Sequence, residues 1–479
     1  MKRQPPVPRR RQTGVVFYLF VVLTLLTMAT LSILPAGLLS GLRANSTPPA
    51  LQQARALILA QLSQPALGGA GARLGQLTRL PDLPIAAAAG EDSVEPIYDG
   101  LAEAGACAWR TWSTGQALRQ PAITGAAARC FGRLPWRELG LSFPPEDDAD
   151  PAGEVPWLIV SPNLAANAAC LPDLNPLMLA NAFTAYACPG AQPYPWLTVL
   201  DPRGNVISDR VAFALILPGP PLPGQVRTSR AAPSNWLDTI TVAAGCTAPC
   251  RPGTYNNAGY GHLDNESWQL IKGPSSGTLS HDAGLYAGTV AFNDQLLFVT
   301  IDELLLVLEQ RARRLTMTAL QTYRTTYNYL PFAAPLNSGA SVCQRSLRIG
   351  RLAVDDGDCG IGQAPDLPAT VLDAGWQRYF LYSVSARCNQ DSPACTAPGL
   401  TLDTRNDVDG LLISPGSAIR QAPWAVSRGT QQRPVTAGAM SANLADWLDT
   451  TENAGGTPDV FISYEQGTGP RNDRLYPID

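Results

Sequence analysis

The sequence predicts an α+β protein: an N-terminal transmembrane helix followed by two modules, each a helix packed on a small antiparallel sheet with disulfides. Three observations support this prediction. An uncharged N-terminal stretch is long enough to cross a bilayer, ten cysteines follow it, and one series of short motifs occurs twice in the same order. The expected divisions are a basic leader at 1–14, the membrane helix at 15–42, a first module at 43–298 and a second module at 299–479.

The N-terminal stretch has the composition of a membrane anchor. No charged residue occurs from Thr13 to Leu42, and this length exceeds the ~20 residues that a helix needs to span a bilayer. A secretory signal peptide has a shorter apolar region and a small-residue cleavage site. Because Lys2, Arg3 and Arg9–Arg11 precede the stretch, the N-terminus is expected in the cytoplasm and the remaining chain in the periplasm. We therefore expect a single-pass protein of a bacterial inner membrane.

The same residues resemble the leader of type IV prepilins and of type II secretion pseudopilins. Basic residues are followed by Gln12-Thr13-Gly14 and then by an apolar run from Val15. The resemblance implies that a prepilin peptidase cuts between Gly14 and Val15, and that other pilins or pseudopilins are the partners. Leu19 stands where major pilins carry a glutamate, so the resemblance implies a minor component, at the tip or at the start of an assembly.

The expected function is therefore a membrane-anchored, periplasmic, non-catalytic component of a type IV pilus or a type II secretion apparatus, with two pilin-like modules. The alternative is an uncleaved, anchored periplasmic protein that binds or scaffolds. Catalysis is not expected, because neither His262 nor His281 lies in a sequence typical of a positioned base. Nucleic-acid binding is not expected either. Of the 35 basic residues, 30 follow Gly14, against 39 acidic residues, and such a surface repels phosphates.

An internal repeat organises the rest of the chain. The paired motifs are RLPDLP (79–84) and YLPFAAP (329–335), LPWREL (134–139) and LPATVL (367–372), WLIVS (157–161) and YFLYS (379–383), LTVLD (197–201) and LTLD (400–403), VAFALILPG (211–219) and VDGLLISPG (408–416), WLDT (236–239 and 447–450), and NDQL (293–296) and NDRL (472–475). Because the order is the same throughout, we interpret the chain as a tandem duplication.

All ten cysteines follow the apolar stretch, which indicates disulfides in an oxidising compartment. They are Cys107, Cys130, Cys170, Cys188, Cys246, Cys250, Cys343, Cys359, Cys388 and Cys395. The repeat predicts the pairs 107–130 and 343–359, and the pairs 170–188 and 388–395, with 246–250 closing a small loop in the first module alone. Crossed pairings remain an alternative at this point.

One acidic run offers candidate metal ligands. Asp355, Asp356 and Asp358 form the run DDGD, and calcium prefers several carboxylate oxygens. A similar run, EDDAD, occurs at 146–150. The alternative interpretation is a solvated acidic loop, since neither run has the spacing of an EF-hand. No other cofactor is expected.

The second module is expected to begin with a helix over about 300–327. Thr300 and Glu303 have the spacing of a capping box. An apolar stripe follows, formed by Ile301, Leu305, Leu308, Ala312, Leu315 and Ala319. After each helix, short apolar runs bounded by turn residues predict antiparallel strands. DPRGN (201–205) and DTRND (403–407) are the predicted hairpin turns.

Overall fold

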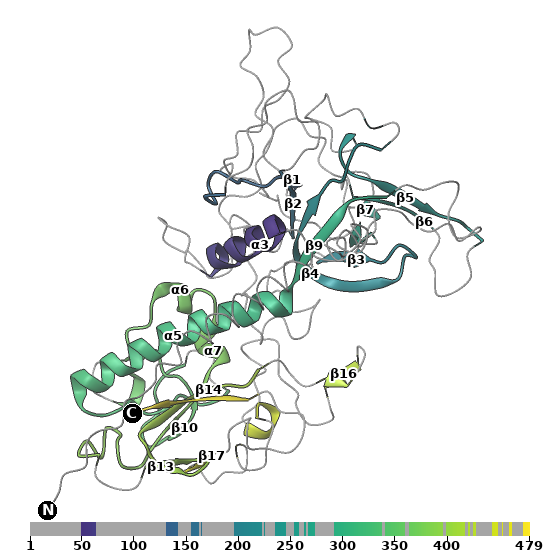
Figure 1. Ribbon diagram of the computed structural model, residues 1–479. Helices are drawn as coiled ribbons and strands as arrows, with labels where there is room; N and C mark the ends of the chain where they lie inside the picture. The colour runs from purple at the N-terminus through teal and green to yellow at the C-terminus, as the bar shows by residue number, and fades with distance from the viewer. Residues whose placement is uncertain are drawn as a thin grey trace, which may run out of the picture.

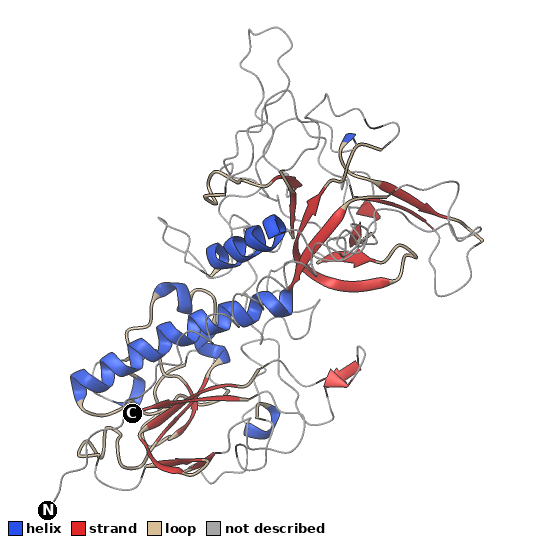
Figure 2. Ribbon diagram, viewed as in Figure 1, coloured by secondary structure: helices blue, strands red, loops and turns tan. Residues whose placement is uncertain are grey.

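In the computed structural model of the protein, two sheet-containing halves are joined by one long helix (Figure 1). The structure describes residues 49–63, 131–141, 155–161, 164, 196–222, 225, 235–245, 253–257, 263–264, 267–273, 292–337, 341–359, 364–395, 399–416, 420–421, 425–427, 443–448, 453, 459–461 and 473–479. Strands make up most of the regular structure in the first half, whereas the second half combines the long helix α5 with its sheets (Figure 2).

The first half contains helix α3 (Pro49–Leu62) beside a seven-stranded sheet. The strands are β1 (Phe131–Arg133), β2 (Trp157–Val160), β3 (Leu197–Leu200), β4 (Val206–Leu217), β7 (Leu263–Asp264), β8 (Ser267–Ile271) and β9 (Gln295–Thr300). Their order is β1-β2-β4-β3-β8-β7, and β9 also pairs with β4. Strands β3 and β8 are parallel, whereas the other pairs are antiparallel. A separate hairpin joins β5 (Thr239–Val242) to β6 (Gly253–Asn256).

The second half has helix α5 (Ile301–Tyr327) along one side of a four-stranded antiparallel sheet (Figure 1). This sheet is formed, in order, by β10 (Ile349–Arg351), β11 (Leu381–Val384), β14 (Gly410–Ser414) and β18 (Arg474–Ile478). A three-stranded sheet of β13 (Arg405–Val408), β12 (Leu400–Leu402) and β17 (Val460–Phe461) lies on the other side. The remaining elements are α6 (Ala369–Leu372), α7 (Trp376–Tyr379), the 3-10 turns η3 (Gly357–Cys359) and η5 (Leu444–Asp446), and the pair β15 (Arg420–Gln421) and β16 (Ala425–Ser427).

The strand pairings of the first half recur in the second half. Strands β1, β2, β4 and β9 pair in the same order as β10, β11, β14 and β18, and all of these neighbours are antiparallel. Likewise β4, β3 and β8 pair as β13, β12 and β17 do, and in both sets the last pair is parallel. The continuous strand β4 thus corresponds to two strands, β13 and β14, which Asp409 separates. The two halves share one connectivity.

Pairing registers give the residue-level correspondence between the halves. Ile216 pairs with Trp157 and Leu296, and Ile413 pairs with Leu381 and Leu475. Trp157 is therefore the counterpart of Leu381. The motif WLIVS (157–161) consequently corresponds to residues 381–385, two residues further along the chain than YFLYS (379–383).

A buried hydrogen bond also occurs in both halves. The Asn257 amide donates to the Asp294 carboxylate at 3.1 Å, and the Asn453 amide donates to the Asp473 carboxylate at 3.5 Å. Each of the four residues is at most 2% exposed. Asp294 and Asp473 belong to the NDQL and NDRL motifs, so these motifs mark the buried start of the last strand in each half.

Helix α5 forms where the sequence predicts it. Its first residue is Ile301, and the Thr300 hydroxyl accepts a hydrogen bond from the Glu303 N–H at 3.2 Å, as in an N-cap. The last helical residue is Tyr327, and the C-cap residue Asn328 has a left-handed backbone (φ 61°). Its buried residues are Ile301, Leu304, Leu305, Leu308, Glu309, Ala312, Thr316, Ala319, Leu320 and Tyr323.

The N-terminal turns of α5 also belong to the first half. They pack on β4, β9 and α3, and Arg210 forms an ion pair with Asp302 at 3.0 Å. Arg55 of α3 forms an ion pair with Glu303. One continuous apolar core consequently runs from α3 along α5 into the second half.

The predicted fold class, a transmembrane helix followed by two modules with small antiparallel sheets, is wrong. None of the helices in the described ranges is both long and apolar enough to cross a bilayer. The predicted membrane helix, 15–42, lies outside those ranges. The sheets also differ from the prediction, since the first has seven strands and each half contains a parallel pair. The physical reason is that β8 and β17 reach the sheet through long connections, which local hairpin patterns do not reveal.

Candidate functional site

Both disulfides predicted for the second half are present. Cys343 is bonded to Cys359, with Cα atoms 5.8 Å apart, and Cys388 is bonded to Cys395, with Cα atoms 4.3 Å apart. The other six cysteines (Cys107, Cys130, Cys170, Cys188, Cys246 and Cys250) and the predicted processing residues Gly14 and Val15 lie outside the described residues. Among the described residues no cysteine is free.

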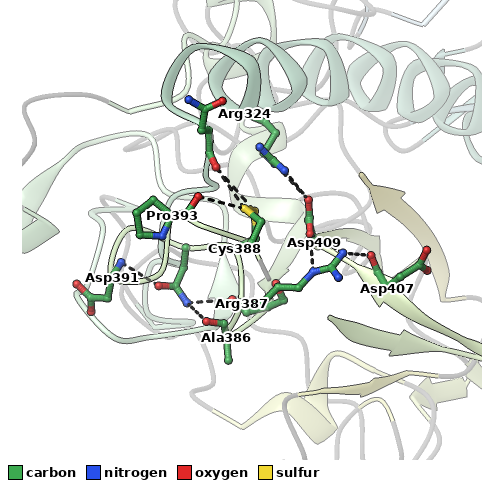
Figure 3. Close-up of a disulfide and its surroundings, with 12 residues drawn as sticks. Arg324, Ala386, Arg387, Cys388, Asp391, Pro393, Asp407 and Asp409 are labelled. Atoms are coloured by element: carbon green, nitrogen blue, oxygen red, sulfur yellow. Dashed lines mark hydrogen bonds and ion pairs between the residues drawn. A yellow bond between two sulfur atoms is a disulfide. The ribbon is translucent and has the colours of Figure 1, made fainter. Parts of the chain in front are cut away.

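The Cys388–Cys395 disulfide lies against the C-terminal end of α5 (Figure 3). Both sulfurs contact the carbonyl oxygen of Asn328, at 4.0 Å and 3.3 Å. Because a disulfide sulfur carries no hydrogen, these are packing contacts. A true hydrogen bond runs from the Leu330 N–H to the Cys388 carbonyl at 3.1 Å. The disulfide loop therefore fixes the chain where it leaves the helix.

Asp409 connects the same helix end to the sheet. Its side chain is only 6% exposed and lies between Arg324 of α5 and Arg387 (Figure 3). Arg324 Nη2 donates to Oδ2 at 2.9 Å, and Arg387 Nε donates to Oδ1 at 2.8 Å. Two guanidinium groups thus compensate one buried carboxylate, as a buried charge requires. We call Arg324, Arg387, Asp409 and the Cys388–Cys395 disulfide the C-terminal clamp of α5.

The clamp is not arranged as a metal centre. The Cys388 and Cys395 sulfurs and a carboxylate oxygen of Asp409 lie within 4.8 Å of one another. Soft metals bind cysteine as the thiolate, whereas these sulfurs are bonded to each other and Asp409 already binds two cations. The geometry instead supports a mechanical role.

The middle of α5 has a second polar anchor, which we call the Glu309 cluster. Glu309 is 4% exposed. It accepts hydrogen bonds from Ser414 Oγ at 2.6 Å, Tyr379 OH at 3.3 Å and Arg474 Nη1 at 3.2 Å. One turn further along, the Arg313 guanidinium stacks on the Tyr476 ring at 4.4 Å. Burial, followed by the Glu309 carboxylate, raises the pKa of Tyr476. These contacts tie α5 to β14, β18 and α7.

The predicted calcium ligands lie in the loop that Cys343–Cys359 closes. Asp355 is exposed, and its Oδ1 accepts a hydrogen bond from the Gly357 N–H at 3.2 Å. The Asp355 and Asp356 carbonyls accept hydrogen bonds from the Cys343 and Cys359 N–H groups, both at 2.9 Å. A calcium site at Asp355, Asp356 and Asp358 stays a prediction.

The polar residues that hold α5 were not predicted from the sequence. Glu309 had a visible signal, because it lies one turn after Leu305 within the apolar stripe. Asp409 and its arginine partners had none, since they come from segments far apart in the sequence.

Comparison of the chain with protein-family models, curated proteins and solved structures gave no match.

Proposed function

We propose that this protein is a non-catalytic component of an extracytoplasmic assembly, of the minor-pilin or pseudopilin kind. The observation that supports the proposal best is the fixation of α5. The helix is 27 residues long, its first turns pack on the first half, and the Glu309 cluster and the C-terminal clamp hold it to the second half. An assembly subunit needs such rigidity, because flexible parts would lose entropy at each contact that forms.

The proposed location is the periplasmic side of a bacterial inner membrane. The two disulfides are typical of an oxidising compartment. Attachment to the membrane, partners among other pilins or pseudopilins, and cleavage by a prepilin peptidase rest on the sequence from Arg9 to Leu42 alone. The alternative, an uncleaved periplasmic binding or scaffold protein, shares everything beyond this segment.

Co-sedimentation tests the proposal. The full chain is expressed in a host with its pilus or secretion genes, and sheared filaments are collected by centrifugation. We expect the wild-type protein to sediment with the filaments. The variant Gly14→Ala should remain exported and disulfide-bonded but should be reduced at least about tenfold in the filament fraction.

A matched control is Gly37→Ala, the same substitution later in the uncharged stretch. It should sediment as the wild type does. Equal sedimentation of wild type and Gly14→Ala, or absence of the wild type from the filaments, would exclude the proposed function and leave the binding or scaffold alternative.

A further inference from the structure

Arg351 is a fully buried arginine whose guanidinium has no hydrogen-bond acceptor among the described residues. It lies in β10, its relative exposure is 0%, and Nε, Nη1 and Nη2 have no hydrogen-bond partner among the described residues. The ring of Trp447 lies 5.0 Å from its guanidinium carbon. Burial, with a smaller effect of Arg378, lowers the pKa of Arg351 to about 10. The group therefore stays charged at neutral pH.

Strand register shows where the Arg351 side chain points. Ser414 and Tyr476 lie on the face of the four-stranded sheet that meets α5, since they contact Glu309 and Arg313. Arg351 pairs with Leu381, which pairs with Ile413, the neighbour of Ser414 in β14. Successive side chains of a strand alternate between faces. Arg351 consequently lies on the opposite face, where Trp447 is also found.

The equivalent arginine of the first half, Arg133, has a hydrogen-bond acceptor and two aromatic rings around its guanidinium. Arg133 occupies the same place in β1, and its Nη1 donates to the Val155 carbonyl at 2.7 Å. Its guanidinium lies between the rings of Trp157 and Trp236, 4.4 Å from each. Trp236 and Trp447 are the tryptophans of the two WLDT motifs. Both halves thus place an arginine of the first sheet strand against the tryptophan of a WLDT motif.

The second half departs from this arrangement at several positions on the same face of the sheet, and two of them lie in β11. Leu381 stands in the place of Trp157, and Ser383 stands in the place of Ile159. Both replacements are smaller, and the second adds a hydroxyl. Ser383 is 0% exposed, and its Oγ has no hydrogen-bond partner among the described residues. Because Ser383 is the diagonal cross-strand neighbour of Arg351, the two side chains leave the same face of the sheet within reach of one small ligand.

We propose that Arg351, Ser383 and Trp447 form a binding site for the carboxylate of a small organic acid. A guanidinium group offers parallel N–H donors that match the two oxygens of a carboxylate. The Ser383 hydroxyl supplies a further donor, and the Trp447 ring provides an apolar wall for the rest of the ligand. The site is independent of the proposed assembly function, because Arg351 and Ser383 lie on the face of the sheet opposite α5.

Thermal unfolding of the purified full-length protein tests the site. Acetate, formate and phosphate are titrated against chloride at matched ionic strength. We expect acetate and formate to raise the melting temperature of the wild type saturably by about 5 °C at a hundredfold excess over Kd. Phosphate, a tetrahedral anion, should give less than half of this rise.

Three variants complete the test. Arg351→Met should abolish the carboxylate effect, and without ligand it should melt no lower than the wild type, because a buried unpaired charge is removed. Ser383→Ala should weaken the apparent affinity about tenfold. Arg345→Met, at an arginine whose exposed ion pair with Asp391 spans 2.9 Å, should respond as the wild type does. The absence of a saturable carboxylate effect in the wild type, or an equal effect in Arg351→Met, would overturn the proposal.

Discussion

At the scale of single residues, the buried carboxylates of Asp409 and Glu309 are compensated by arginines and hydroxyls, whereas the buried guanidinium of Arg351 has no hydrogen-bond acceptor among the described residues. Asp409 binds two arginines, and Glu309 binds one arginine and two hydroxyls. Removal of one partner from such a group leaves the others buried without compensation. Each of these carboxylates is therefore expected to contribute more to stability than an exposed ion pair does.

Glu309→Ala should lower the free energy of unfolding by about 2–3 kcal/mol, since Ser414, Tyr379 and Arg474 all lose their acceptor. Urea denaturation measures this change. The control is Glu303→Ala on the same helix, where the carboxylate is 37% exposed in its ion pair with Arg55, and the loss should stay below about 1 kcal/mol. Equal losses in both variants would contradict the role given to Glu309.

At the scale of elements, α5 depends on contacts at both of its ends. The N-terminal end has ion pairs to the first half, and the C-terminal end has the clamp. The Cys388–Cys395 bond closes a loop with a sequence separation of 7 residues. Even a short loop of this kind restricts the unfolded chain.

The double variant Cys388→Ser/Cys395→Ser should lose about 2–3 kcal/mol of unfolding free energy. Hydrogen exchange should show the loss of protection concentrated at the last turn of α5 and at Leu330, whose N–H bonds to the Cys388 carbonyl. Protection at Leu304 and Leu305 should be unchanged. A uniform loss along the helix would show that the disulfide does not act locally.

The same elements show what the sequence can predict. Helix α5 was predictable to within one residue at its start because capping, periodicity and the terminating Asn328 are all local signals. The β3–β4 and β12–β13 hairpins were predictable for the same reason. The parallel strands β8 and β17 were not, since nothing local marks a strand that arrives through a long connection.

The two-residue displacement between WLIVS and YFLYS has a physical cause as well. A shift of two residues keeps every side chain on its original face of a strand, so hydrophobic alternation cannot detect it. Only the pairings with Ile216 and Ile413 reveal that Ser161 corresponds to Ser385. The Arg351 site was hidden by this displacement, because the correct register is needed to match Ser383 with Ile159.

At the scale of the whole molecule, one strand connectivity occurs twice, and α5 belongs to both copies. Its first turns complete the core of the first half, and the rest of the helix covers the sheet of the second half. This sharing couples the halves mechanically. The division at 298/299 stays a prediction, and it falls within β9, directly before the shared helix.

The central claim is that the chain acts as a processed assembly subunit, and N-terminal sequencing of the membrane-extracted protein tests it most directly. Cleavage after Gly14 removes five basic residues, Lys2, Arg3 and Arg9–Arg11, which would otherwise hold the N-terminus at the lipid surface. The account predicts that the mature protein begins at Val15. A mature protein that begins at Met1 would contradict the claim.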